Sequence, residues 1–429
     1  MSDDLAPASH SLNPGVRRRE VFAWAMYDFA NSGYTTVVLT AVFSAYFVSV
    51  VAARAEWATF AWTAMLAVSY LLVMVAGPLI GAWADARAAK KRVLLLATIG
   101  CVLATALLMG ATAGTLALAV VCIIVSNFCY AIGENITAAF LPELARPEAV
   151  GKVSGWGWAW GYVGGLVALG ACLWWIKGAA GRGQTTGEAI PGTMLITALI
   201  YALGATVTFA WLRERAVAVP VHVAHESLAR LKSTLREAAR YRDLALVFAC
   251  GTFYQAGVAT VITLAAIYAQ EVMGFSTEDT LMLILVVNVT ACAGAFGFGY
   301  VQDAIGKKKA LMLTLFGWVV MVAFAYFATT RALFWVAANL AGLCMGSSQS
   351  AGRALVAYFS PPGKSGEMFG LFGVFTRLAA VLGPLTYGAV SWITANDHRL
   401  AMLITGVFFV VAIFILARVD ETRGRNAAK

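Results

Sequence analysis

The chain has 429 residues, of which 61% are hydrophobic and only 12% charged, and it carries a formal net charge of +9. This composition excludes a soluble globular domain and predicts a polytopic membrane protein. Positive charge in such a chain is typical of loops that face anionic lipid, so we do not interpret it as nucleic-acid binding. The seven cysteines lie in apolar segments without disulfide or metal-binding spacing, so we expect neither a metal nor a cofactor.

The first apolar segment, residues 21–51, follows a polar tail that ends in three arginines. It is far longer than the apolar region of a signal peptide, about 7–15 residues, so we expect it to be retained as a membrane anchor. Inside this segment Asp28 is surrounded by apolar residues. A charged side chain at the bilayer centre costs roughly 2.5–3.5 kcal/mol on insertion scales, which makes Asp28 a candidate functional residue.

Apolar segments long enough to cross a bilayer, about 20 residues each, predict twelve transmembrane helices and an all-α fold. The first six spans are residues 21–51, 59–82, 93–110, 116–141, 153–176 and 193–212. The second six are residues 244–269, 281–301, 310–328, 332–359, 368–394 and 400–417.

Basic residues are distributed unequally between the two sides of the predicted membrane. With both termini in the cytoplasm, 24 of the 31 lysines and arginines lie on the cytoplasmic side and five on the opposite side. The remaining two, Arg353 and Arg377, lie within spans. The distribution therefore predicts an even number of spans and cytoplasmic termini.

The longest polar segment divides the chain into two sets of six spans. We expect an N-tail (1–20), an N-terminal bundle (21–212), a linker (213–243), a C-terminal bundle (244–417) and a C-tail (418–429). In the linker, Leu228, Leu231 and Leu235 recur at helical spacing among basic residues, which predicts an amphipathic helix on the inner leaflet. This helix is either a surface connection or a site for a regulator.

Two motifs recur in the second half of the chain at nearly the same separation. Gly81-x-x-x-Asp85, followed by basic residues, returns 218 residues later as Gly299-x-x-x-Asp303, and Phe140-Leu-Pro142 has a counterpart 219 residues later. The halves are therefore repeats. Parallel repeats of six spans, with this motif between the second and third helices, resemble the major facilitator superfamily over essentially the whole chain.

This resemblance implies two six-helix bundles around a central cavity and transport by alternating access. It also implies that the repeated motif latches the bundles on the cytoplasmic side, unless its residues merely flank helix ends. Carried over by position, the amino-terminal latch is Gly81, Asp85 and Arg87, and the carboxy-terminal latch is Gly299, Asp303 and Lys307. Because Ala88 replaces the glycine that Gly306 preserves, we expect the amino-terminal latch to be looser.

Several spaced residues narrow the resemblance to one branch of the superfamily. They are Trp24, Tyr27-Asp28, Ala30-Asn31-Ser32, Tyr34, Leu141-Pro142-Glu143 and Gly155-Trp156-Gly157. Together they look like the vacuole-effluxer branch, which includes autophagy-related amino-acid exporters of fungal vacuoles and many bacterial relatives. The resemblance implies efflux of a small solute, with amino acids as the leading class.

Four charged side chains lie well inside the predicted spans: Asp28, Glu134, Arg353 and Arg377. Glu134 and Arg353 differ by 219 residues, so they are pseudosymmetric positions in opposite bundles. We expect either Glu134 with Arg353, or Asp28 with Arg353, to form an ion pair that closes the cytoplasmic side. The alternative is a static pair inside one bundle. Removing one partner of a buried pair costs roughly 3–5 kcal/mol.

The charged and polar residues inside the spans are also candidates for proton coupling and for substrate binding. We expect Asp28, or Glu134, to couple transport to protons, because its arginine partner would come and go during the cycle. Arg377 is positioned to receive a substrate carboxylate through a two-pronged hydrogen bond. Further substrate-binding candidates, each of which could instead be a contact between helices, are Tyr27, Asn31, Tyr34, Asn135, Gln255, Asn288 and Gln349. Trp156, with Trp158 and Trp160, could line an aromatic pocket or pack at an interface.

The sequence thus predicts a secondary active transporter, a proton-coupled exporter or exchanger of amino acids or similar zwitterions. The alternatives are a major facilitator for a sugar, peptide, drug or organic acid, and a membrane sensor or lipid-moving protein. No catalytic triad or carboxylate dyad is evident, so we do not expect an enzyme. We expect a monomer in a bacterial plasma membrane whose partners are a small solute, protons and the lipid bilayer.

Overall fold

The computed structural model describes residues 11–53, 57–216, 241–394 and 397–428. The predicted amphipathic helix of the linker, with Leu228, Leu231 and Leu235, lies outside these ranges. The described residues form helices joined by short turns, with one isolated bridge between Leu12 and Ala145.

The first half contains six long helical segments. The first is α1 (Arg18–Tyr34), which continues through π-helical turns and the short α2 (Phe43–Tyr46) to Val51. The others are α3 (Ala58–Arg87), α4 (Lys90–Leu107), α5 (Leu116–Ala139), α7 (Val150–Gly181) and α8 (Thr186–Trp211), with the short α6 (Leu141–Leu144) after α5.

The second half repeats this order. Its helices are α10 (Arg242–Glu271), α11 (Thr277–Ile305), α12 (Lys307–Phe327), α13 (Arg331–Phe359), α14 (Ser365–Ile393) and α15 (His398–Ala417), followed by the short α16 (Glu421–Ala427). The prediction of twelve long helices is confirmed. Among the described residues, eleven of them are also apolar enough by composition to cross a membrane.

Among the twelve long helices that the structure describes, α13 is the one that is not apolar enough by composition to count as a membrane span. Its burial among other helices explains its polar residues. The stretch from Ser347 to Ser350 is polar, and Arg353 follows one turn later. This part of α13 is almost entirely buried against α11, α12 and α7. Because protein rather than lipid surrounds it, its polar groups find partners inside the molecule.

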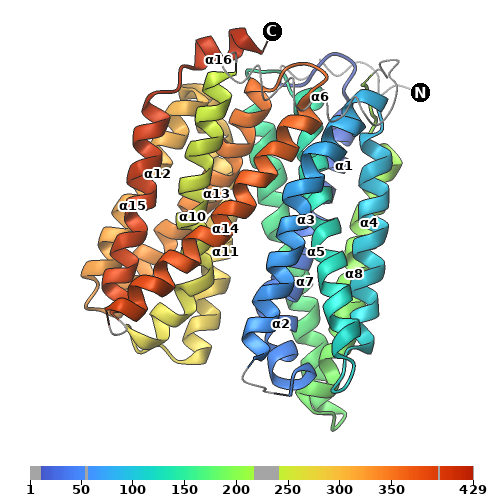
Figure 1. Cartoon of the computed structure of the whole chain (residues 1–429), viewed down its shortest axis with the longest axis vertical. Helices are drawn as coiled ribbons and strands as arrows, with labels where there is room; N and C mark the ends of the chain where they lie inside the picture. Colours follow the sequence, from blue (N-terminus) through green and yellow to red (C-terminus); the bar gives the residue numbers. More distant parts are fainter. Residues whose placement is uncertain (1–10, 54–56, 217–240, 395–396, 429) are drawn as a thin grey trace.

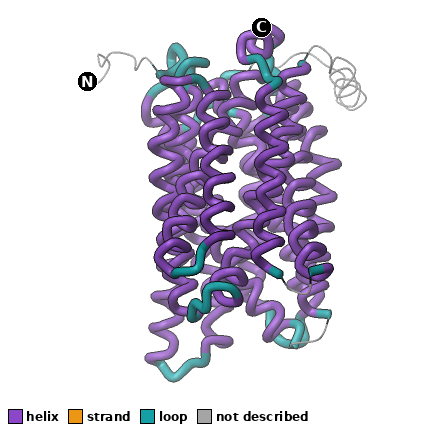
Figure 2. Tube along the Cα trace, turned by 90° about the vertical axis from the view of Figure 1, so that its left-hand side faces the viewer, coloured by secondary structure: helices purple, strands orange, loops and turns teal. Residues whose placement is uncertain are grey.

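The two halves form two bundles that lie side by side in Figure 1, the first in blue to green and the second in yellow to red. Helix α16 and the first turn of α1 lie at the same end, which we call the basic end; α2 lies at the opposite end. The side view in Figure 2 shows the long helices running between these two ends.

Two seams join the bundles, α3 against α14 and α7 against α11. Glycines permit the close approach: a Cβ on Gly81 would overlap the carbonyl oxygen of Gly366, and a Cβ on Gly155 would lie 2.9 Å from the Cα of Gly299. The hydrogen bonds between described residues of the two halves all lie nearer the basic end. The bundles are therefore closed against each other at that end.

Candidate functional site

Two ion pairs connect the bundles on the basic-end side of the helices. Nη1 of Arg353 on α13 lies 2.7 Å from Oδ2 of Asp28 on α1, and Nη2 of Arg377 on α14 lies 2.7 Å from Oε2 of Glu134 on α5. The predicted contact between Glu134 and Arg353 is therefore not made in this conformation, whereas the alternative pair, Asp28 with Arg353, is present. Pseudosymmetric positions need not touch, and α5 packs on α14, which brings Glu134 to Arg377.

All three nitrogens of the Arg353 guanidinium form hydrogen bonds, and two aromatic rings lie close to it. Its Nε donates to the hydroxyl of Ser154 (3.1 Å), and its Nη2 donates to the carbonyl oxygen of the same residue (2.7 Å). Its Cζ lies 4.8 Å from the ring centroid of Trp24 and 5.3 Å from that of Trp158. We call these four partners, Trp24, Asp28, Ser154 and Trp158, the Arg353 receptor.

A glycine makes room for this arrangement. A Cβ on Gly157 would lie 2.6 Å from Nη2 of Arg353 and 2.8 Å from the ring of Trp24, so a larger residue would displace the guanidinium. The Arg353 side chain is 8% exposed and the Asp28 side chain 15%. Charge, hydrogen bonds and aromatic faces all act on one buried cation.

The environment of Arg377 is more open. Beyond its bond to Glu134, it has one aromatic contact, with its Cζ 5.4 Å from the ring centroid of Tyr70. Its buried Nε has no hydrogen-bond partner among the described residues. The Glu134 side chain is 35% exposed, compared with 13% for Arg377. This pair therefore leaves one buried donor without a partner among the described residues, beside a carboxylate that is partly exposed.

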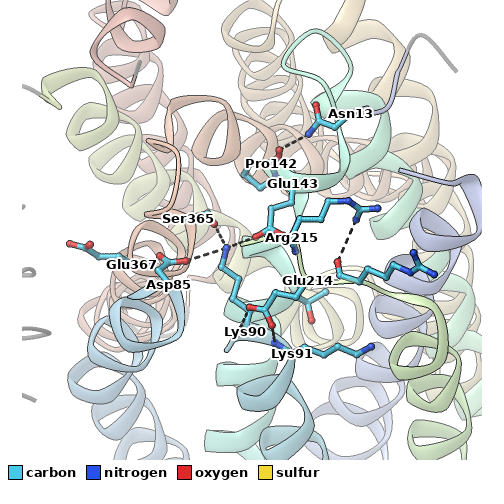
Figure 3. Close-up of polar contacts among 12 residues, drawn as sticks. Asn13, Asp85, Lys90, Lys91, Pro142, Glu143, Glu214, Arg215, Ser365 and Glu367 are labelled. Carbon is cyan, nitrogen blue, oxygen red and sulfur yellow. Dashed lines mark hydrogen bonds and ion pairs between the residues drawn. The ribbon is translucent and has the colours of Figure 1, made fainter. Parts of the chain in front are cut away.

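At the basic end, the amino-terminal latch is centred on Asp85 and Lys90 (Figure 3). Asp85 accepts a hydrogen bond from the backbone N–H of Glu367 at the start of α14 (2.9 Å) and forms an ion pair with Lys90 (3.1 Å). Lys90 is 1% exposed and also reaches Glu143 (2.6 Å) and the hydroxyl of Ser365 across the seam (2.7 Å).

Arg87 was expected in this latch, and the structure corrects that expectation. Its side chain is exposed and lies over the ring of Trp83, with 5.6 Å between Cζ and the centroid. Ala88 adopts a left-handed conformation with φ of 49°, which turns the chain between α3 and α4 and directs Lys90 inward. In the sequence Lys90 is one of four basic residues of this loop, and nothing in the spacing distinguishes it from the others.

The carboxy-terminal latch joins Asp303 of α11 to the start of α7. Asp303 accepts hydrogen bonds from the backbone N–H groups of Gly151 (3.0 Å) and Lys152 (2.8 Å) at the start of α7, where the helix dipole favours an anion. Lys307 lies 3.5 Å from Asp303. The Asp303 side chain is 16% exposed, whereas Asp85 is fully buried. These contacts give no support to the expectation that the amino-terminal latch is looser.

A second symmetric feature was not predicted. Glu214, after α8, accepts hydrogen bonds from the N–H groups of Lys90 and Lys91 at the start of α4, and Glu421, after α15, accepts one from Lys308 at the start of α12. Each carboxylate therefore caps the third helix of its own bundle. The recurrence of an acidic residue shortly after the sixth span of each half is the signal that could have found it.

Most of the neutral candidates lie inside the N-terminal bundle. The Tyr27 hydroxyl lies 3.1 Å from the hydroxyls of Thr98 and Tyr201, and Tyr201 donates to the amide oxygen of Asn31 (2.8 Å). Tyr34 shares a hydrogen bond of 2.8 Å with Ser126. These side chains are buried and connect helices, so Tyr27, Asn31 and Tyr34 lie on the side of α1 that packs against α4, α5 and α8.

Other candidates lie closer to the two arginines. Gln349 is one helical turn before Arg353 on α13 and forms a reciprocal amide pair with Gln255 of α10, with N–O distances of 2.7 and 3.2 Å. Asn135 follows Glu134, and its Nδ2 has no hydrogen-bond partner among the described residues. Asn288 donates to the backbone of its own helix.

Trp156 does not face the arginines. Its Nε1 lies 3.3 Å from the hydroxyl of Tyr300 at the α7–α11 seam, and Lys152 lies over its ring. Trp158 is the tryptophan that contacts Arg353. Residues two apart on a helix are about 200° apart around its axis, so the two tryptophans face opposite sides. The assignment of Trp156 to the substrate site is corrected accordingly.

The chain is similar in sequence to known membrane transporters. The family described as "Vacuole effluxer Atg22 like" matches residues 48–429, so the Trp24–Tyr34 stretch lies outside the matched part. An MFS-type transporter of Bacillus subtilis, YxiO, is 26% identical over 417 residues, which cover 95% of this chain and 96% of that protein.

Solved structures show the same fold. The human organic anion transporter MFSD10 superposes with a TM-score of 0.72 at 16% identity, over 93% of this chain and 99% of that one. The proton:xylose symporter XylE superposes with a TM-score of 0.70 at 16% identity, over 95% of this chain and 96% of that one. The molecule therefore has the fold of the major facilitator superfamily.

Proposed function

The chain belongs to the Atg22-like family of vacuole effluxers and is a multi-pass secondary transporter of the major facilitator superfamily, not an enzyme. On this premise we propose that it exports or exchanges amino acids or similar zwitterions, and that proton movement is coupled to this transport. The observation that carries the proposal is the ion pair between Glu134 and Arg377.

This pair presents the two charges that a zwitterion needs. Arg377 has a buried Nε without a partner, and Glu134 is half-buried with one oxygen bonded to Arg377. A substrate carboxylate would bind the guanidinium with two parallel hydrogen bonds, and a substrate ammonium would bind the carboxylate. Since the pair joins α5 to α14, a bound zwitterion would contact both bundles and respond to their separation.

Asp28 is the residue to which we assign proton coupling. In this conformation Arg353 neutralises it. Opening of the basic end would separate α13 from α1 and leave the buried carboxylate without a counter-charge, at a cost of roughly 3–5 kcal/mol. Protonation of Asp28 removes that cost, so proton binding and release at Asp28 would be linked to opening and closing of the basic end. The sequence left Glu134 as the alternative titrating residue, but its greater exposure makes it the poorer candidate.

The basic end is assigned to the cytoplasm on the distribution of lysine and arginine. This orientation makes the present conformation one that is closed to the cytoplasm. The bacterial relative favours a plasma membrane, and we propose a monomer because each chain has both bundles and both seams.

The proposal is tested by counterflow of radiolabelled amino acids in proteoliposomes, with and without a pH gradient. We expect at least one amino acid to exchange in the absence of a gradient and to accumulate when a gradient is applied. Absence of exchange for every amino acid would overturn the proposed substrate class.

The coupling residue is tested in the same vesicles with Asp28→Asn. We expect exchange of neutral amino acids to persist, their gradient-driven accumulation to disappear, and the pH dependence of their exchange to flatten, because an amide cannot take up the proton. Loss of neutral amino-acid exchange together with accumulation would instead identify Asp28 as structural or as part of the zwitterion site.

A further inference from the structure

The Arg353 receptor is a complete binding site for a cation, and the N-terminal bundle supplies all of it. Asp28 gives a carboxylate, Ser154 gives a carbonyl and a hydroxyl oxygen, and Trp24 and Trp158 give two aromatic faces. The C-terminal bundle contributes only the guanidinium that occupies the site. Arg353 thus acts as an internal ligand that arrives from the other half of the molecule.

We propose that this receptor binds the guanidinium or ammonium group of a cationic substrate when the basic end opens and Arg353 withdraws. The inference rests on the proposed function, because it requires that the bundles separate during transport. It adds a second subsite, for a positively charged side chain, to the site for the zwitterion at Glu134 and Arg377. Arginine-like amino acids are the ligand class that both subsites together would accept.

The energetics of the emptied receptor favour a replacement cation. Without Arg353, the receptor would expose a buried carboxylate and two indole faces with no positive charge between them. A cation between tryptophans gains about 2 kcal/mol or more when it is desolvated, and aromatic cages of this kind recognise organic cations. A proton on Asp28 would satisfy the carboxylate but would leave the aromatic faces unused.

The geometry favours a planar cation over a compact one. The oxygen acceptors bond all three nitrogens of the guanidinium, Nε, Nη1 and Nη2, and its Cζ lies over two aromatic rings. Guanidinium matches such a set of acceptors, whereas an ammonium group offers a point charge. A Cβ on Gly157 would enter this space, so the glycine keeps the slot open for a flat group.

Competition between Arg353 and the substrate would also affect the conformational equilibrium. The receptor is available only when the basic end is open, so a ligand that binds there stabilises the open state in proportion to its affinity for it. Weakening the closed state should therefore strengthen binding of the cation. This dependence distinguishes the receptor from the Glu134–Arg377 site, whose acid is already 35% exposed while the basic end is closed.

The first experiment compares arginine with citrulline, which has nearly the same shape but an uncharged side chain, in proteoliposome counterflow. We expect arginine to be favoured by at least about tenfold, corresponding to 1.4 kcal/mol. Trp158→Leu should bring the ratio of arginine to citrulline close to one, and Trp158→Phe should keep part of it. Trp160→Phe is the matched control: it lies on the same helix, contacts Phe22 and Phe29, and should leave the ratio unchanged.

Trp158 is a suitable position because its Nε1 has no hydrogen-bond partner among the described residues, so Phe removes no bond there. The second experiment measures binding of radiolabelled arginine to purified protein in detergent. Asp85→Asn with Asp303→Asn weakens both latches and should increase arginine binding several-fold. Adding Trp158→Leu to this background should reverse the increase.

The outcomes separate this inference from the proposed function. If neutral amino acids exchange but arginine is favoured no more than citrulline, and weakened latches do not increase arginine binding, the receptor proposal is wrong and the proposed function stands. If no amino acid exchanges, yet arginine binding rises with weakened latches and falls with Trp158→Leu, the receptor is supported and the proposed transport activity is not.

Discussion

The two ion pairs between the bundles use the same chemistry in opposite ways. Arg353 has hydrogen bonds from Nε, Nη1 and Nη2 and lies over two aromatic rings, whereas Arg377 has one bonded partner, one ring and an Nε without a partner among the described residues. Their acids differ in the same sense, because the Asp28 side chain is 15% exposed and that of Glu134 is 35% exposed.

The number of contacts that protein groups make to each arginine separates a structural role from a ligand-binding role. A cation whose donors and faces are all occupied by protein stabilises one arrangement of the helices. A cation with an unbonded donor beside a partly exposed acid is the better candidate for exchanging contacts with a ligand. Breaking each pair should therefore change different measurements.

The largest effect is expected from Arg353→Ala. The variant leaves Asp28 buried without its counter-charge, which destabilises the closed basic end by roughly 3–5 kcal/mol, or more than a hundredfold. The measurement is the alkylation rate of a cysteine placed at Ser350, a buried position at the α7–α13 contact, in a background without other cysteines.

Arg331→Ala is the control for that variant. Arg331 pairs with Asp279 at the end opposite the basic end, where both side chains are about half exposed, and such surface pairs contribute about 0–1 kcal/mol. Its labelling rate should stay at the wild-type value. Equal labelling of Arg353→Ala and wild type would show that the Asp28 pair does not hold the basic end closed.

The next largest effect is expected from Arg377→Ala or Glu134→Gln, measured as substrate exchange. A hydrogen bond to a charged group contributes about 1.5–3 kcal/mol, so exchange should fall roughly 10- to 100-fold. Labelling at Ser350 should change far less than in Arg353→Ala. If these variants opened the basic end as strongly as Arg353→Ala, the contrast between the two pairs would be lost.

Gly81→Ala should open the basic end through a steric effect. A Cβ there would overlap the backbone of Gly366, and overpacking of a tight contact costs about 1–3 kcal/mol. We expect labelling at Ser350 to rise roughly tenfold. Gly170→Ala is the matched control, since a Cβ at that helical glycine would meet nothing within 4 Å. Unchanged labelling in Gly81→Ala would mean that the α3–α14 seam tolerates a wider spacing while closed.

The smallest effect is expected at Tyr70, whose ring lies over Arg377. Tyr70→Phe keeps the ring and should leave substrate affinity unchanged. Tyr70→Leu removes a cation–π contact of about 0.5–1 kcal/mol and should weaken affinity roughly threefold. A loss in Tyr70→Phe as large as in Tyr70→Leu would show that the hydroxyl, and not the ring, supports Arg377.

The sequence by itself determined the architecture and the inventory of charged groups. Hydrophobic length and the distribution of basic residues depend only on local composition, so they predicted twelve helices and the orientation. The recurrence of two motifs at nearly one offset predicted the two repeats. The cost of charge in a bilayer likewise singled out Asp28, Glu134, Arg353 and Arg377 before any contact was known.

Only the tertiary structure decided which of these groups meet. A repeat offset gives pseudosymmetric positions, but contact depends on which helices pack together, and so Glu134 pairs with Arg377. The rotation of α7 turns Trp158, not Trp156, towards Arg353. The left-handed turn at Ala88 selects Lys90, not Arg87, for the latch. Each of these choices depends on the rotation of a helix about its axis or on the conformation of a single turn. Composition and spacing specify neither.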